Sequence, residues 1–168
     1  QYYPERNLND LRKVIGEFHQ IHPDNILPGN GASELITWAG YEASKFGESC
    51  IPSPGFVDYE RSLNCWDAKF FYSELPKNWN NKFPQSFPIK PTCDVLWITN
   101  PHNPTGQLWD KKSLEIILKQ YKLVICDEAF LSLTPNGEKE SLVPLTKTFD
   151  NLIVIRSLTK LFNMAGLR

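Results

Sequence analysis

Hydrophobic residues recur along the chain with two alternating patterns. Apolar positions spaced three and four apart predict an amphipathic helix over about Leu8–His19, with Asn7 or Asn9 as its cap. Further helices are predicted from about Ser33 to Ser44, near 57–63 and around 114–118, and another begins at Ser157. Short apolar runs between them have the length of strands. These predicted strands cover 48–51, 68–72, 94–99, 123–126 and 152–155.

This alternation of helices and strands predicts an α/β fold. Several strands are continuous apolar runs, which is typical of a mostly parallel sheet covered on both faces, and we expect a three-layer αβα arrangement. Ligands bind such sheets at the carboxyl ends of the strands. The segment 73–91, rich in Pro, Asn and Lys, is expected to wrap over the surface with short helical turns.

Composition narrows the classes of function. The 168 residues are 41% hydrophobic and 22% charged, as in one globular domain, and the net charge of −1 gives no basic field for nucleic acid. No apolar run approaches the roughly 20 residues that span a bilayer, and Gln1–Arg12 contains no signal-peptide pattern. The four cysteines form no Cys-x-x-Cys pair and the three histidines are scattered. We therefore expect no metal site, no disulfide framework and a reducing, cytoplasmic setting, with Cys126 buried as a free thiol.

Small residues open the second predicted helix. Backbone N–H groups at 29–33, at the positive end of a helix dipole, form a natural seat for a phosphate. The alternative is an ordinary capped helix with Ser33 near its N-cap. The segment matches neither the dinucleotide fingerprint nor a P-loop.

Two Asn-Pro steps and a glycine follow the strand 94–99, in Asn100–Gly106. Because a residue before proline is biased toward extended backbone, these steps indicate a rigid loop that aims an amide side chain over the strand end. A simple connection between strand and helix is the alternative.

Acidic residues follow the strand 123–126. A carboxylate at the end of an apolar strand costs several kcal/mol unless it is compensated, so Asp127 is expected to meet a protonated partner. Glu128 is the alternative buried acid, and a helix-capping acid is the second alternative.

A lysine lies between hydroxyls and an arginine at the end of the chain. A helix beginning near Ser157 would carry Arg168 about two turns beyond Lys160. Hydroxyls and a guanidinium suit a phosphate monoester, and a lysine there can attack an aldehyde. The alternative is a solvated surface lysine.

These features together specify one kind of ligand. It carries an aldehyde for Lys160 and a protonated ring nitrogen for Asp127, and pyridoxal phosphate has both together with a phosphate. The candidate phosphate contacts are Ala32, Ser33, Ser157, Thr159 and Arg168.

The motifs also resemble a known family. In order they are Gly-Ala-Ser-Glu, Pro-Gly-Phe-x-x-Tyr, Asn-Pro-His-Asn-Pro-Thr-Gly, Asp-Glu-Ala-Phe, Ser-Leu-Thr-Lys and Ala-Gly-Leu-Arg. This order, which covers essentially the whole chain, resembles the fold-type I pyridoxal-phosphate enzymes of the class I/II aminotransferase family. Within that family it is most similar to histidinol-phosphate aminotransferases and to the threonine-phosphate decarboxylases of cobalamin biosynthesis.

The resemblance implies a role for each matching residue. Lys160 would form a Schiff base with the cofactor and then move protons, and Asp127 would pair with the pyridine nitrogen. Asn103 would hydrogen-bond the phenolic oxygen, and Phe56 would stack on the ring. Ala32, Ser33, Ser157, Thr159 and Arg168 match the phosphate cup. Tyr3 matches a tyrosine that reaches the phosphate of a neighbouring subunit, which implies a homodimer.

One departure from the family pattern affects the reaction. Phe130 replaces a tyrosine that donates to the phenolic oxygen in most family aminotransferases, and this favours the threonine-phosphate decarboxylase-like branch acting on a phosphorylated substrate. Histidinol-phosphate transamination with 2-oxoglutarate is the alternative, as is a non-catalytic remnant that binds only cofactor or a partner. The substrate is expected to be an amino acid or a phosphorylated amine.

The length also departs from the family. Because members are about twice as long, residues 1–168 are expected to be a partial large domain without the N-terminal arm and the small C-terminal domain, and inactive alone.

Overall fold

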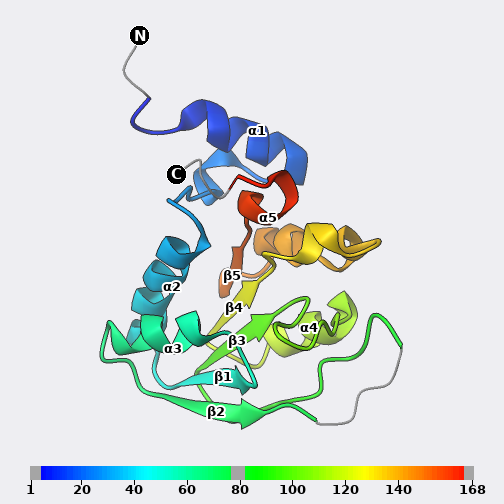
Figure 1. The fold of residues 1–168 in the computed structure, drawn as a ribbon. Coiled ribbons are helices and arrows are strands. Elements are labelled where there is room, and N and C mark those ends of the chain that lie inside the picture. Colours follow the sequence, from blue (N-terminus) through cyan, green and yellow to red (C-terminus); the bar gives the residue numbers. More distant parts are fainter. Residues whose placement is uncertain (1–4, 77–81, 165–168) are drawn as a thin grey trace.

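A computed structural model describes residues 5–76 and 82–164, in which helices and strands alternate along the chain (Figure 1). The helices are α1 (Asn9–His19), α2 (Ala32–Phe46), α3 (Val57–Asn64), α4 (Lys111–Leu118) and α5 (Leu158–Phe162). The strands are β1 (Ser49–Ser53), β2 (Phe70–Glu74), β3 (Val95–Thr99), β4 (Leu123–Asp127) and β5 (Leu152–Ile155). Short 3₁₀ turns lie at Pro23–Asn25, Leu131–Leu133, Gly137–Glu140 and Val143–Lys147.

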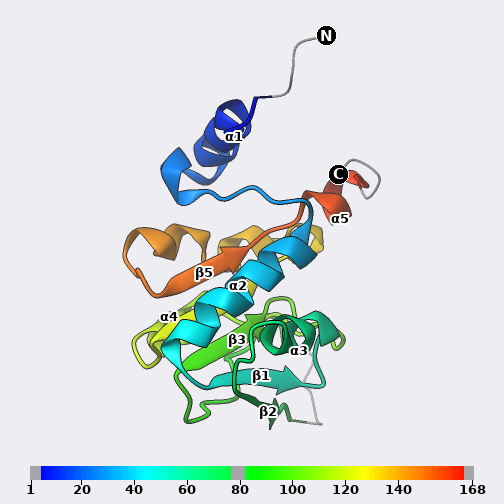
Figure 2. The same cartoon turned by 90° about the vertical axis from the view of Figure 1, so that its left-hand side faces the viewer.

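The five strands form one sheet in the order β2-β1-β3-β4-β5, and every neighbouring pair is parallel. The predicted parallel α/β fold is therefore confirmed. Thr99 pairs with Asp127, which in turn pairs with Ile155, so the ends of β3, β4 and β5 are level. Figures 1 and 2 show α1 beyond β5, and Figure 2 shows that the strands run toward the side where α5 begins.

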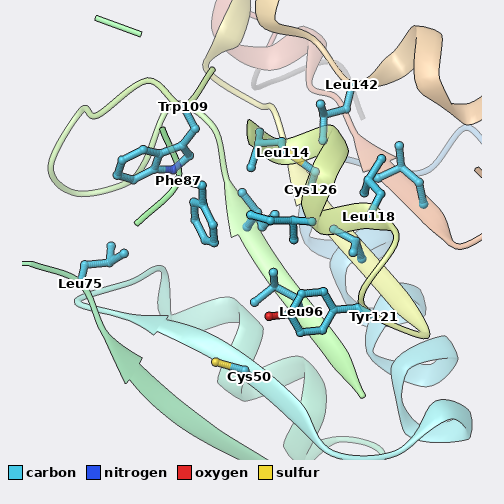
Figure 3. Packing of buried hydrophobic residues seen from close by; sticks show 14 residues of the cluster. Cys50, Leu75, Phe87, Leu96, Trp109, Leu114, Leu118, Tyr121, Cys126 and Leu142 are labelled. Carbon is cyan, nitrogen blue, oxygen red and sulfur yellow. The ribbon is translucent and has the colours of Figure 1, made fainter. Parts of the chain in front are cut away.

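Side-chain alternation along the two central strands divides the core between the two faces of the sheet. One cluster joins α2 and α3 to Val95, Trp97, Leu123 and Ile125. The other joins α4 to Leu96, Ile98, Val124 and Cys126, and Figure 3 shows part of it. Both faces are covered, as the continuous apolar runs predict, and Cys126 is a buried free thiol as expected.

The alternation of β4 also directs the two acids at its end. Asp127 follows Ile125 by two positions and therefore lies on the face that α2 and α3 cover. Glu128 follows Cys126 by two positions and turns to the opposite face. Both acids are buried, at 6% and 1% exposure.

Two predictions about the ends of helices are wrong. The N-cap of α1 is Leu8, in the left-handed region with φ 50° and without a side-chain cap, and not Asn7 or Asn9. The helix that begins near Ser157 ends at Phe162, because Asn163 adopts a left-handed φ of 52°. Arg168 itself lies outside the described residues.

Two surface features also differ from expectation. The described part of the segment 73–91 contains no helical turn. Ser73 and Glu74 complete β2, and Gln85 forms an isolated bridge with Trp109. The apolar residues of α1 are largely exposed, with Val14 at 63% and Phe18 at 75%. None of the helices in the described ranges is long and apolar enough to cross a membrane.

Candidate functional site

Asp127 lies at the end of β4, where two neutral groups donate to its carboxylate. The phenol of Tyr59 donates to Oδ2 at 2.8 Å and the Ala129 N–H donates to Oδ1 at 2.9 Å. Burial raises the pKa of Asp127, whereas these two donors and the nearby charge of Lys160 oppose that rise. No cation within the described residues forms an ion pair with Asp127. Each oxygen still has a free lone pair, so the carboxylate can accept a bond from a protonated ligand.

Glu128, in contrast, has its own cation. Arg156 Nη1 lies 2.8 Å from Glu128 Oε2, and the hydroxyl of Ser141 and the N–H of Leu142 donate to the same carboxylate at 2.7 and 2.6 Å. Arg156 also contacts Glu138 and donates to Ser132. Sequence reasoning left open which acid was buried. Both are buried, and within the described ranges Glu128 has a paired cation whereas Asp127 has none.

Lys160 lies in α5, after the end of β5, and its side chain is exposed. Its ammonium is 5.3 Å from the centre of the Phe130 ring and close enough to Asp127 to favour the charged carboxylate. The lysine makes no ion pair or hydrogen bond among the described residues, so its amine is available to a ligand. Lys160 and Asp127 thus lie near each other, after the end of β5 and at the end of β4.

Aromatic side chains form the wall next to Asp127. Phe56 is the N-cap of α3 and is half-buried. Its ring meets Tyr59 edge to face at 5.6 Å, and Tyr59 packs on Trp97 at 5.2 Å. Phe56, the predicted stacking residue, therefore contacts Tyr59, which in turn contacts the buried carboxylate of Asp127.

The start of α2 lies next to the start of α3. The hydroxyl of Ser33 donates to Asp58 Oδ2 at 2.6 Å, and Arg61 binds both Asp58 and the Ser33 carbonyl. Burial alone would raise the pKa of Asp58, but the hydrogen bonds from Ser33 and Arg61 lower it. The side chain of Ser33 is thus already occupied, while Ala32 and Ser33 form the first turn of α2, where N–H groups are unpaired.

The two asparagines of the loop after β3 have different partners. Asn100 is fully buried, and its amide exchanges two hydrogen bonds with the main chain of Trp109, at 2.8 and 3.2 Å. Asn103 is half-buried, and its side chain has no hydrogen bond among the described residues. Asn100 therefore holds the loop, and Asn103 is the amide that remains free for a ligand.

The remaining candidate phosphate contacts are only partly described. Ser157 is the N-cap of α5 without a side-chain capping bond, and Thr159 lies in the first turn of that helix. Neither hydroxyl has a hydrogen-bond partner in the part of the chain that the structure describes, so both suit a ligand. Tyr3 and Arg168 lie outside the described residues.

Sequence reasoning missed two residues that shape the site. Tyr59 belongs to the Pro-Gly-Phe-x-x-Tyr motif, but only the packing of α3 on the sheet brings its phenol to Asp127. Arg156 immediately precedes Ser157, and an arginine at the end of an apolar strand is the signal that could have indicated a buried acidic partner.

The fold and the site together define an α/β protein that brings an unpaired buried carboxylate and an available lysine to the carboxyl edge of a parallel sheet. The family described as aminotransferase class I and II matches residues 1–168, and the chain belongs to that family.

Known proteins similar to this chain include members of both candidate branches. A protein of Caldanaerobacter subterraneus subsp. tengcongensis, provisionally named threonine-phosphate decarboxylase, is 35% identical over 99% of the chain and 47% of its own length. The structure of histidinol-phosphate aminotransferase from Clostridium acetobutylicum is 30% identical, with a TM-score of 0.82 over 99% of this chain and 50% of that one.

A second solved structure supports the fold alone. Histidinol-phosphate aminotransferase from Sinorhizobium meliloti, in complex with pyridoxal-5'-phosphate, is 17% identical with a TM-score of 0.79, over 99% of this chain and 46% of that one. The chain spans about half the length of the relatives it matches.

Proposed function

We propose that this chain is the pyridoxal-phosphate-binding part of a class I/II aminotransferase-family enzyme, and that the described residues belong to its large domain. The observation that carries the proposal is the contrast between the two buried acids. Glu128 is neutralised by Arg156, whereas the donors to Asp127 among the described residues are neutral, and the amine of Lys160 lies near enough to favour its charged form. A protonated pyridine nitrogen would supply the missing cation.

Other predicted site residues suit the rest of that cofactor. The free amide of Asn103 suits the phenolic oxygen, the half-buried Phe56 suits the ring face, and Lys160 suits the aldehyde. When bound, the cofactor supplies an electron-accepting ring that weakens bonds at the α-carbon of an amino-acid substrate. The chain itself holds the ring charged through Asp127 and moves protons through Lys160.

The phosphate is assigned to the start of α2 and the start of α5. Because the Ser33 hydroxyl is bonded to Asp58, we assign the contribution of Ala32 and Ser33 to their backbone N–H groups, at the positive end of a 15-residue helix. Ser157 and Thr159 would add hydroxyls. Arg168 and Tyr3 complete the proposed phosphate contacts, Tyr3 from the second subunit of a homodimer.

The proposed substrate is an amino acid or phosphorylated amine, and we favour a threonine-phosphate decarboxylase-like reaction. Phe130 supports that branch, because its ring lies against Lys160 and offers no hydroxyl to the phenolic oxygen. Histidinol-phosphate transamination is the second candidate, since relatives of about 30% identity carry that name.

Cofactor binding is tested by adding pyridoxal phosphate to the purified protein and recording absorbance in the visible range. We expect a protein-dependent band that Lys160→Ala abolishes and Lys122→Ala, a matched exposed lysine, leaves unchanged. No band in the unaltered protein, or a band that survives Lys160→Ala, would contradict the proposal and favour a non-catalytic remnant.

The branch is tested with the full-length protein and two substrates. Threonine phosphate should release carbon dioxide without consuming 2-oxoglutarate. Glutamate formed from histidinol phosphate and 2-oxoglutarate, without carbon dioxide from threonine phosphate, would assign the transaminase branch instead.

A further inference from the structure

Tyr59 is a buried tyrosine whose phenol lies between β3 and β4. Its oxygen is 2.8 Å from Asp127 Oδ2 and 2.8 Å from Thr99 Oγ1, and the residue is 1% exposed. Packing against Phe56 and Trp97 holds the ring in place. The phenol is therefore fixed where it can direct the carboxylate.

The protons in this cluster have one consistent arrangement when Asp127 is charged. A carboxylate only accepts, so the single phenolic proton of Tyr59 points to Asp127, and the hydroxyl of Thr99 donates to the phenol oxygen. Burial and the charge of Asp127 raise the pKa of Tyr59 well above its usual value, so the phenol stays protonated and remains a donor. The result is a relay from Thr99 through Tyr59 to Asp127.

The relay opposes the effect of burial on Asp127. Burial favours the neutral carboxyl, which would be a poor partner for a positively charged ring nitrogen. The charged form is held by the Ala129 N–H, by Lys160 from α5 and by Tyr59 from α3, while Cys126 and Glu128 are its neighbours along the chain. Among the described side chains, Tyr59 is the one that donates a hydrogen bond to Asp127.

We propose that Tyr59 is a positioning residue that keeps Asp127 ionised and oriented toward the ring nitrogen of the cofactor, with Thr99 fixing the direction of the phenolic proton. This inference rests on the proposed cofactor. Tyr59 acts through Asp127 and needs no contact with substrate.

The inference is tested by comparing two probes, pyridoxal phosphate and its 1-deaza analogue, in which carbon replaces the ring nitrogen. Because Tyr59→Phe removes a hydrogen bond to a charged group, we expect its affinity for pyridoxal phosphate to fall about tenfold. The analogue has no nitrogen for Asp127 to bind, so its affinity should not change. Tyr41→Phe, on the exposed surface of α2, is the matched control and should change neither affinity.

The pH dependence gives a second readout. In Tyr59→Phe the preference for pyridoxal phosphate over the analogue should disappear at a pH about one unit higher than in the unaltered protein, because Asp127 loses a donor to its charged form. Thr99→Val should shift this pH in the same direction by less, and it serves if Tyr59→Phe does not fold.

The possible outcomes separate the two claims. Equal weakening of both probes in Tyr59→Phe would overturn the inference and leave a purely structural role. Unchanged affinity for both would also overturn it. If the unaltered protein binds neither probe, the proposed function itself fails.

Discussion

Replacing Arg156 with methionine should destabilise the protein by leaving Glu128 buried without its cation. Methionine keeps most of the apolar stem and removes the guanidinium that lies 2.8 Å from Glu128, whose side chain is 0% exposed. Losing one partner of a buried pair costs about 3–5 kcal/mol. Because Ser141 and Leu142 still donate to the carboxylate, we expect about 3 kcal/mol, or roughly a hundredfold in the folding equilibrium.

The effect should depend on pH in one direction. Burial already raises the pKa of Glu128, and without Arg156 the pKa of the folded state rises further above that of the unfolded chain. The destabilisation is therefore largest above the raised pKa and diminishes as the pH falls toward the unfolded value, because the protonated acid needs no cation.

Urea denaturation at pH 8 and pH 5 measures both effects. Lys122→Met is the matched control, because Lys122 and Asp94 are also 2.8 Å apart but exposed, at 63% and 36%. An exposed pair contributes about 0–1 kcal/mol. Adding Glu128→Gln to Arg156→Met should recover part of the loss. The reasoning is refuted if Arg156→Met costs no more than Lys122→Met at pH 8.

Three further predictions concern other parts of the chain. Asn100→Ala should cost about 1–3 kcal/mol of unfolding free energy, because it leaves buried main-chain groups of Trp109 without their hydrogen bonds to Asn100. Asn103→Ala should change the unfolding free energy by less than about 0.5 kcal/mol and should weaken pyridoxal phosphate binding. Denaturation and cofactor titration distinguish the two, and equal stability losses would contradict their assignment. On α4, Leu114→Ala should lower the unfolding free energy by about 2–5 kcal/mol, because Leu114 is buried, and Ile116→Ala should lower it by less than about 0.5 kcal/mol, because Ile116 is exposed. Similar shifts in the melting temperature of the two variants would contradict the burial of the helix face that carries Leu114. Burial lowers the folded-state pKa of His102 below its ordinary value, so stability should fall as the pH drops from that ordinary value toward the lowered one and then level off. His102→Gln should remove this part of the acid sensitivity in a denaturation series.

Much of the fold was predictable because β3 and β4 are continuous apolar runs, which suit a sheet covered on both faces. The need of Asp127 for a protonated partner also followed from its place after an apolar strand. The sequence did not indicate that Glu128, and not Asp127, is paired with a cation. Arg156 is 28 residues away from Glu128 along the chain and meets it only when β4 and β5 pair.

Other details depended on tertiary packing in the same way. The Pro-Gly-Phe-x-x-Tyr motif contained Tyr59 without indicating its contact. Tyr59 and Asp127 are 68 positions apart along the chain and meet only when α3 packs on the sheet. The two Asn-Pro steps look alike in the sequence, so the sequence did not indicate that Asn100 binds the main chain of Trp109 whereas Asn103 does not. The early end of α5 depends on Asn163, which tolerates left-handed backbone better than most residues.

Reductive trapping tests the central claim most directly. The protein is incubated with pyridoxal phosphate, reduced with borohydride and digested, and the modified lysine is located by peptide mass spectrometry. The account predicts a single cofactor label on Lys160 that Lys160→Ala eliminates. A label distributed over exposed lysines such as Lys122, or unchanged labelling in Lys160→Ala, would contradict it.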